Sequence, residues 1–151
     1  MLPSFDWETV LRVSAQLLLA YVLSLPIAFE REKAARSAGL RTFPLVAMAS
    51  CGYMLFAEGL FEDSPEAQSR LVQGLMTGIG FIGGGAILKS GATVHGTATA
   101  ASIWNTGAVA AAVAYGRYEI AVVLSAMNYL TLRVLGHFKY EQEAQRNDKG
   151  S

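Results

Sequence analysis

The sequence predicts an all-α fold, a polytopic membrane bundle of about five transmembrane helices. Of the 151 residues, 52% are apolar and only 16% are charged, whereas about a quarter of a globular domain is charged. The apolar residues also gather in long runs. These are Thr9 to Phe29, Phe43 to Leu60, Leu71 to Leu88, Ala98 to Tyr115 and Ile120 to Phe138. A helix of about 20 residues spans the hydrocarbon of a bilayer. A soluble protein with buried helices is the alternative, but five helices without a polar stripe leave no surface for water.

The distribution of positive charge predicts the orientation in the membrane. With the N-terminus outside and the C-terminus in the cytoplasm, nine Lys and Arg residues lie on the cytoplasmic side. Only Arg12, Arg70 and Arg117 lie on the other side. This bias follows the positive-inside rule. The net charge is zero, so no global field would attract nucleic acid.

Local signals mark the ends of the predicted helices. The first run is too long for a signal peptide and reads as an uncleaved helix with Trp7 at the interface. Thr42 is a suitable N-cap for the second helix, with Pro44 in its first turn. Ser64-Pro65 marks a turn or a helix start ahead of the third apolar run. The four residues from Gly116 to Glu119 make the fourth and fifth helices an antiparallel hairpin.

The stretch from Gln73 to Gly91 holds seven glycines and one charge, Lys89. In a membrane, glycine lets neighbouring helices approach closely. At about 100° per residue, the glycines fall on two faces of one helix. The sequence therefore predicts that this helix is wedged between two partner helices. The predicted packing residues are Gly74, Gly78, Gly80, Gly84 and Gly85.

The same stretch contains the pattern GxGxxG at Gly78, Gly80 and Gly83. A dinucleotide site would need a strand before these glycines and an acidic residue about 20 positions later. There is no Asp or Glu between Ala67 and Tyr118. The sequence therefore argues against a nucleotide-binding fold.

Small residues open the fourth predicted helix and predict that it packs tightly against the third. Asn105 lies two turns along it, and an amide in lipid needs a partner. The candidate intramembrane polar site comprises Asn105, Thr99, Thr106, Thr77 and Asn128. Magnesium prefers carboxylate oxygens, which the predicted centre lacks. We therefore expect no cofactor, no resident metal and at most a weak magnesium interaction.

A second candidate site lies at the predicted cytoplasmic face. The second and fourth helices both begin there, and helix N-termini together with Arg bind anions. The candidate residues are Glu30, Arg31, Arg41 and Lys89, with Arg41 as anchor and Glu30 holding it by a salt bridge. The alternative is that these charges only set the topology of the chain.

The chain divides into a membrane domain, residues 1–138, and a polar cytoplasmic tail, residues 139–151. The tail has no apolar periodicity and is predicted to be disordered. The two histidines, His95 and His137, have no neighbouring nucleophile in the sequence. We therefore expect no enzymatic activity.

Several motifs, in this order, resemble the membrane domain of the MgtC/SapB family. They are Arg12, Glu30-Arg31-Glu32, the segment 38–42 (AGLRT), Arg70, the segment 78–87 (GIGFIGGGAI) and the segment 96–104 (GTATAASIW). The resemblance covers roughly residues 9 to 138. It implies a five-helix protein of the bacterial inner membrane, associated with magnesium limitation and, in pathogens, with survival inside host cells. Many members carry a soluble C-terminal domain that has no counterpart in this sequence.

Two functional hypotheses follow. The first is a protein of magnesium homeostasis that handles or transports cations. The second is a regulatory module that transports nothing and binds and modulates another membrane protein. The expected partners are the lipid bilayer, a second copy in a homodimer and a further membrane protein.

Overall fold

The computed structural model describes residues 6–34, 38–61, 63–91 and 93–148, and the side chains up to Gly136. The helices and strands of these residues are α1 (Trp7–Ala34), α2 (Thr42–Leu60), α3 (Pro65–Gly85), β1 (Leu88–Ser90), β2 (Thr93–His95), α4 (Thr97–Ala114) and α5 (Tyr118–Asp148). The prediction of an all-α membrane bundle is confirmed. The short antiparallel pair β1-β2 was not predicted.

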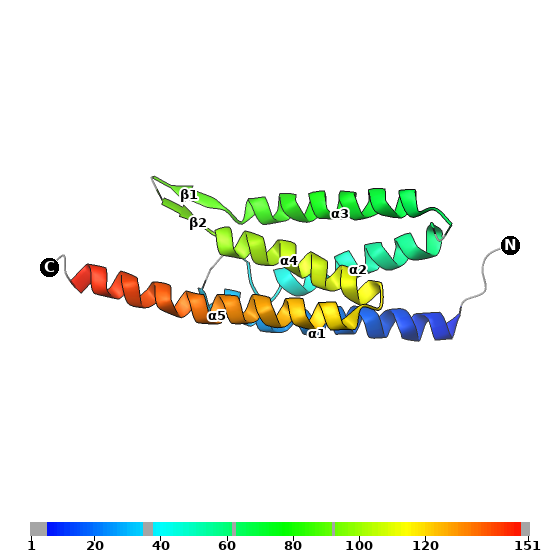
Figure 1. The fold of residues 1–151 in the computed structure, drawn as a ribbon, viewed down its shortest axis with the longest axis horizontal. Coiled ribbons are helices and arrows are strands. Elements are labelled where there is room, and N and C mark those ends of the chain that lie inside the picture. Colours follow the sequence, from blue (N-terminus) through cyan, green and yellow to red (C-terminus); the bar gives the residue numbers. More distant parts are fainter. Residues whose placement is uncertain (1–5, 35–37, 62, 92, 149–151) are drawn as a thin grey trace.

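Successive helices run in opposite directions, so α1 begins at one end of the bundle and α5 ends at the other (Figure 1). Helix α4 contacts α1, α2, α3 and α5, which places it at the centre. Helix α3 lies at one edge, mainly against α4 and α2. Within the described residues, three helices are long and apolar enough to cross a membrane by themselves, namely α1, α2 and residues 118–136 of α5.

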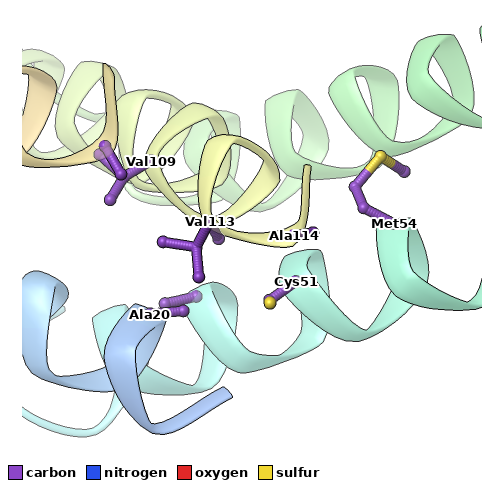
Figure 2. Packing of buried hydrophobic residues seen from close by; sticks show 9 residues of the cluster. Ala20, Cys51, Met54, Val109, Val113 and Ala114 are labelled. Carbon is purple, nitrogen blue, oxygen red and sulfur yellow. The ribbon is translucent and has the colours of Figure 1, made fainter. Parts of the chain in front are cut away.

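Small side chains form the contact between α1, α2 and α4. Ala20, Cys51 and Val113 are fully buried and point toward one another from three different helices (Figure 2). Val109 and Met54 extend the same cluster along the bundle. Because these side chains are short, the three helix backbones lie close together, as in tightly packed membrane helices.

Polar side chains join α1 to α4 and to α5 by hydrogen bonds. The Gln16 amide donates to the backbone carbonyls of Val113 and Ala114, at 3.3 and 3.1 Å. The hydroxyl of Ser125 in α5 donates to the carbonyl of Leu23 in α1, at 2.6 Å. Each bond gives a side-chain donor a partner that lipid cannot provide.

The helix starts agree with the sequence signals in part. Ser64 caps α3 by accepting a hydrogen bond from the Ala67 N–H, with Pro65 in the first turn, which is one of the two predicted alternatives. The predicted N-cap Thr42 is wrong by one residue, because Arg41 holds that position and makes no side-chain capping bond. At α1, the hydroxyl of Thr9 and the backbone N–H groups of Glu8 and Thr9 lower the pKa of Asp6.

Gly96 fixes the hairpin between α3 and α4. Its φ is +86°, and a Cβ placed on it would lie 1.9 Å from the carbonyl oxygen of Ala86. Only glycine permits both the left-handed conformation and this close approach. Gly96 therefore lies directly against Ala86 at the end of α3, and β1 and β2 pair between these two residues.

Helix α5 is longer than the apolar pattern indicates. It continues as a helix through Asp148, so the disorder predicted from residue 139 onward is wrong for residues 139–148. The polar residues of its last turns lack an apolar stripe but are good helix formers, with Glu, Gln, Ala and Arg among them. Residues 149–151 lie outside the described part of the chain.

We predict that Gly96→Ala destabilises the protein by about 2 kcal/mol or more, because strain at positive φ adds to the clash with Ala86. Gly91→Ala is the matched control, since Gly91 also has a positive φ, +60°, but its Cβ would meet no atom within 4 Å. Thermal unfolding of the two purified variants in detergent measures the difference. Equal losses of stability would contradict the role given to the Ala86 contact.

Candidate functional site

The interface of α4 and α5 holds the two predicted asparagines. Asn105 Nδ2 donates to the carbonyl of Leu124, at 3.4 Å. Asn128 Oδ1 accepts a hydrogen bond from the hydroxyl of Ser102, at 3.1 Å. Asn105, for which the sequence left an interhelical bond and a functional site as alternatives, thus makes an interhelical bond. Ser102 and Ser125 were not among the candidate residues. As hydroxyl residues within apolar runs, they could have been identified from the sequence as further interhelical donors.

The three threonines of the predicted polar site lie in different surroundings. Thr106 is fully buried, and its hydroxyl donates to the carbonyl of Ser102 within α4, at 2.8 Å. Thr99 is also buried in α4. Thr77 is exposed on α3 and bonds only to the carbonyl of Gln73 in its own helix. The structure therefore joins Asn105, Asn128 and Thr106 around Ser102 and leaves Thr77 apart from them.

A groove of about 330 Å³ runs along this interface. Asn105, Asn128 and Thr131 line it with Leu124 and Met127. Asn128 Nδ2 is buried there without a hydrogen-bond partner. The hydroxyl of Thr131 donates to the carbonyl of Met127. The polar atom that remains buried and unpaired here is a donor, which suits a hydrogen-bond acceptor rather than a bare cation.

The predicted charged site is not held together as expected. Arg41 is exposed, and no salt bridge joins it to Glu30 in the part of the chain that the structure describes, where the two ion pairs are Glu66–Arg70 and Arg117–Glu119. The predicted salt bridge is therefore wrong. Glu30 is half-buried in α1. Arg31 is half-buried beside it in α1, and Lys89 is exposed on β1.

Glu32, not Glu30, holds the connection between α1 and α2. Its carboxylate accepts a hydrogen bond from the Leu40 N–H, at 2.9 Å. A Cβ on the buried Gly39 would lie 1.7 Å from the same carboxylate oxygen. In the Gly-Leu-Arg-Thr motif, the N–H of Leu40 therefore binds the Glu32 carboxylate, and the missing side chain of Gly39 leaves room for it. The sequence shows Glu32 among the charged residues after α1, but it does not show which backbone group Glu32 would contact.

The predicted glycine packing is also corrected. A Cβ on Gly74, Gly78, Gly80, Gly84 or Gly85 would meet nothing within 4 Å, so none of the five mediates a close contact inside the chain. The close approach of α3 and α4 occurs at two other glycines. A Cβ on Gly83 would lie 3.1 Å from the carbonyl oxygen of Ala100, and one on Gly107 would lie 2.2 Å from Cδ1 of Ile79. Helix α3 thus has two neighbouring helices, α4 and α2, but the five predicted glycines do not make its close contacts.

A second groove, of about 410 Å³, separates α2 from α3. It is mostly apolar. The residues that line it are Val46, Ala49, Ser50, Tyr53, Leu71, Gly74, Leu75, Gly78, Ile79 and Ile82. Two of the exposed glycines, Gly74 and Gly78, therefore border an open groove instead of a packed helix.

The described residues contain no group of three or more His, Cys, Asp or Glu side chains that could hold a metal ion. His95 is exposed on β2, and the side chain of His137 lies outside the described part of the chain. The chemistry available at the two grooves is hydrogen bonding by neutral amides and hydroxyls together with apolar contact.

We predict that the Ser102–Asn128 hydrogen bond contributes about 0.5 to 1.5 kcal/mol to stability. A double-mutant cycle with Ser102→Ala and Asn128→Ala, measured by unfolding in detergent micelles, gives this coupling energy. Thr77→Val replaces Ser102→Ala in the control cycle, because Thr77 bonds only within its own helix, and its coupling to Asn128 should be near zero. Equal coupling in the two cycles would refute the assignment.

Comparison with known proteins identifies the family. The sequence model of the MgtC family matches residues 17–140. Protein SrpB of Synechococcus elongatus is 38% identical over 143 residues, which are 87% of this chain and 77% of that protein. "Putative magnesium transporter YhiD" of Escherichia coli strain K12 is 35% identical over 79% of this chain and 58% of its own length.

Protein MgtC of Brucella abortus is 38% identical over 68% of this chain and 42% of its own length. The chain thus spans about half the length of YhiD and MgtC. No solved structure matches the chain. The match to the family model covers most of the bundle, including α4 and the α4–α5 interface. The chain belongs to the MgtC family.

Proposed function

We propose that this chain is a protein of the bacterial inner membrane that serves magnesium homeostasis by binding and modulating another membrane protein, without conducting magnesium itself. Family membership and the names of the relatives MgtC and YhiD support the link to magnesium. The hydrogen bonds that the polar side chains make between helices support modulation of a partner rather than conduction of magnesium.

The observation that carries the proposal is that these polar side chains hold helices together. Asn105, Ser102, Gln16 and Ser125 each bond to an adjacent helix, and four of the five bonds occupy backbone carbonyls. A magnesium ion needs near-octahedral oxygen ligands and loses its water reluctantly. A conducting path along these oxygens would have to break the bonds that keep α1, α4 and α5 together.

The groove between α2 and α3 is the surface that we assign to the partner. Its lining extends from Leu71 to Ile82, about three turns of α3. Gly74 and Gly78 have no side chain in the way, so the backbone of another helix can approach closely. The occupant is a transmembrane helix of the modulated protein, which would lie along the groove as helices lie in apolar grooves elsewhere.

Cation handling is the second candidate function. The printed name of YhiD favours it, as does the groove between α4 and α5, where Asn105, Asn128 and Thr131 contribute polar atoms. Hydrated cations would have to pass along neutral oxygens there.

Magnesium flux into liposomes separates the two functions. With the full chain reconstituted around an internal magnesium dye, we expect the same influx as in vesicles without protein, and no effect of Asn105→Ala. Influx well above that background, abolished by Asn105→Ala, would contradict the proposal and support cation handling.

Growth at limiting magnesium tests the partner surface in a strain that depends on this chain. Gly78→Leu fills the α2–α3 groove and should abolish growth, although the folded protein remains at a normal level in the membrane. Gly80→Leu is the matched control, because Gly80 has equal space around it but does not line the groove. Normal growth of the Gly78→Leu strain would exclude the groove as the site of action.

A further inference from the structure

Helix α3 is the least enclosed helix of the membrane bundle. Of its residues only Ile79 and Gly83 are buried, and Phe81 is 83% exposed. It packs mainly against α4 and α2. Unlike α1 and α2, it is not among the helices that are apolar enough to cross a membrane alone. Lipid by itself is therefore a poor cover for the side of α3 that faces away from the bundle.

The composition of that side shows why. At about 100° per residue, the positions turned to one side by about 100° to 180° from the buried Ile79 and Gly83 form a stripe along the helix. We call it the outer face of α3, and it consists of Glu66, Arg70, Gln73, Thr77, Phe81 and Gly84, all of them exposed. The Gln73 amide makes no side-chain hydrogen bond within the described part of the chain. An amide without a partner in hydrocarbon is costly.

We infer that the outer face of α3 pairs with the same face of a second copy of this chain, with the two helices parallel and related by a two-fold axis along the membrane normal. Two copies inserted in the same direction bring each residue opposite its own counterpart or a near neighbour at the same depth. The outer face must therefore be complementary to itself, and three of its features meet this requirement.

The first feature is the amide of Gln73, which carries both donors and an acceptor and can pair with the Gln73 amide of the second copy. The second is the exposed ion pair Glu66–Arg70, with N···O at 3.2 Å. Across a parallel two-fold contact Glu66 faces Glu66 and Arg70 faces Arg70, but each copy already neutralises these charges by its own exposed ion pair, so their mutual repulsion is small. The third is Gly84, where no Cβ prevents close approach of the backbones.

This surface differs from the groove assigned to a partner protein. The two surfaces meet at Gly74, which is seven residues from Phe81, but the rest of the groove lies at Gly78 and Ile82 on the side of α3 that turns toward α2. The test of the dimer at Gln73 and the test of the groove at Gly78 therefore change different positions, and failure of either proposal leaves the other intact.

Cysteine cross-linking of the full chain in vesicles tests the inference. Cys51, the one cysteine, is buried in α2, so Cys51→Ala provides a background without thiols. In that background Thr77→Cys should give disulfide-linked dimers on oxidation at a low ratio of protein to lipid. Leu130→Cys is the control, because Leu130 is 50% exposed at a comparable distance along the parallel helix α5. It should give only the collisional background.

Adding Gln73→Leu to the Thr77→Cys chain should lower the cross-linked fraction about five-fold, the effect expected from loss of one interhelical hydrogen bond. Gln73→Asn retains the amide and should restore part of it. Circular dichroism should be the same for all variants, since Gln73 is exposed. Equal cross-linking at positions 77 and 130, or no response to Gln73→Leu, would overturn the inference and leave lipid or a different protein as the cover of α3.

Discussion

The close packing of α4 against all four other helices is the constraint on which the rest of the bundle depends. Its buried positions are occupied by Ala, Val, Ser, Thr and Gly almost throughout. Lipid provides no hydrophobic drive for helices to associate, so dispersion contacts and hydrogen bonds at short range must hold them. A large side chain at Gly107 or Val113 would separate α4 from its neighbours and remove both contributions at once.

The polar residues follow from the same constraint. A backbone carbonyl on a membrane helix already accepts one bond within the helix, and its second lone pair is accessible only at close range. Gln16 and Ser125 reach such carbonyls because the helices are near one another. The amides and hydroxyls inside the bundle therefore report on its assembly, and their presence is not in itself a sign of an ion path.

Composition and spacing were sufficient to predict the helices, a turn or helix start at Ser64-Pro65 and the need of Asn105 for a partner, because each depends on local chemistry or on the cost of an amide in lipid. The glycine contacts could not be predicted, since glycines on every side of α3 leave its orientation open. The contacts of Gly83 with Ala100 and of Ile79 with Gly107 show which side of α3 faces α4. The role of Glu32 depends on the path of the loop, which no periodicity encodes.

The most direct test of this account is an intramolecular disulfide between α3 and α4. A Cβ on Gly83 would lie 3.6 Å from the Cα of Ala100, within the range over which cysteine pairs can bond. In the Cys51→Ala background, Gly83→Cys with Ala100→Cys should therefore cross-link within one chain on mild oxidation, whereas Gly80→Cys with Ala100→Cys should not. Cross-linking of the second pair, or of neither, would show that the two helices do not meet as described.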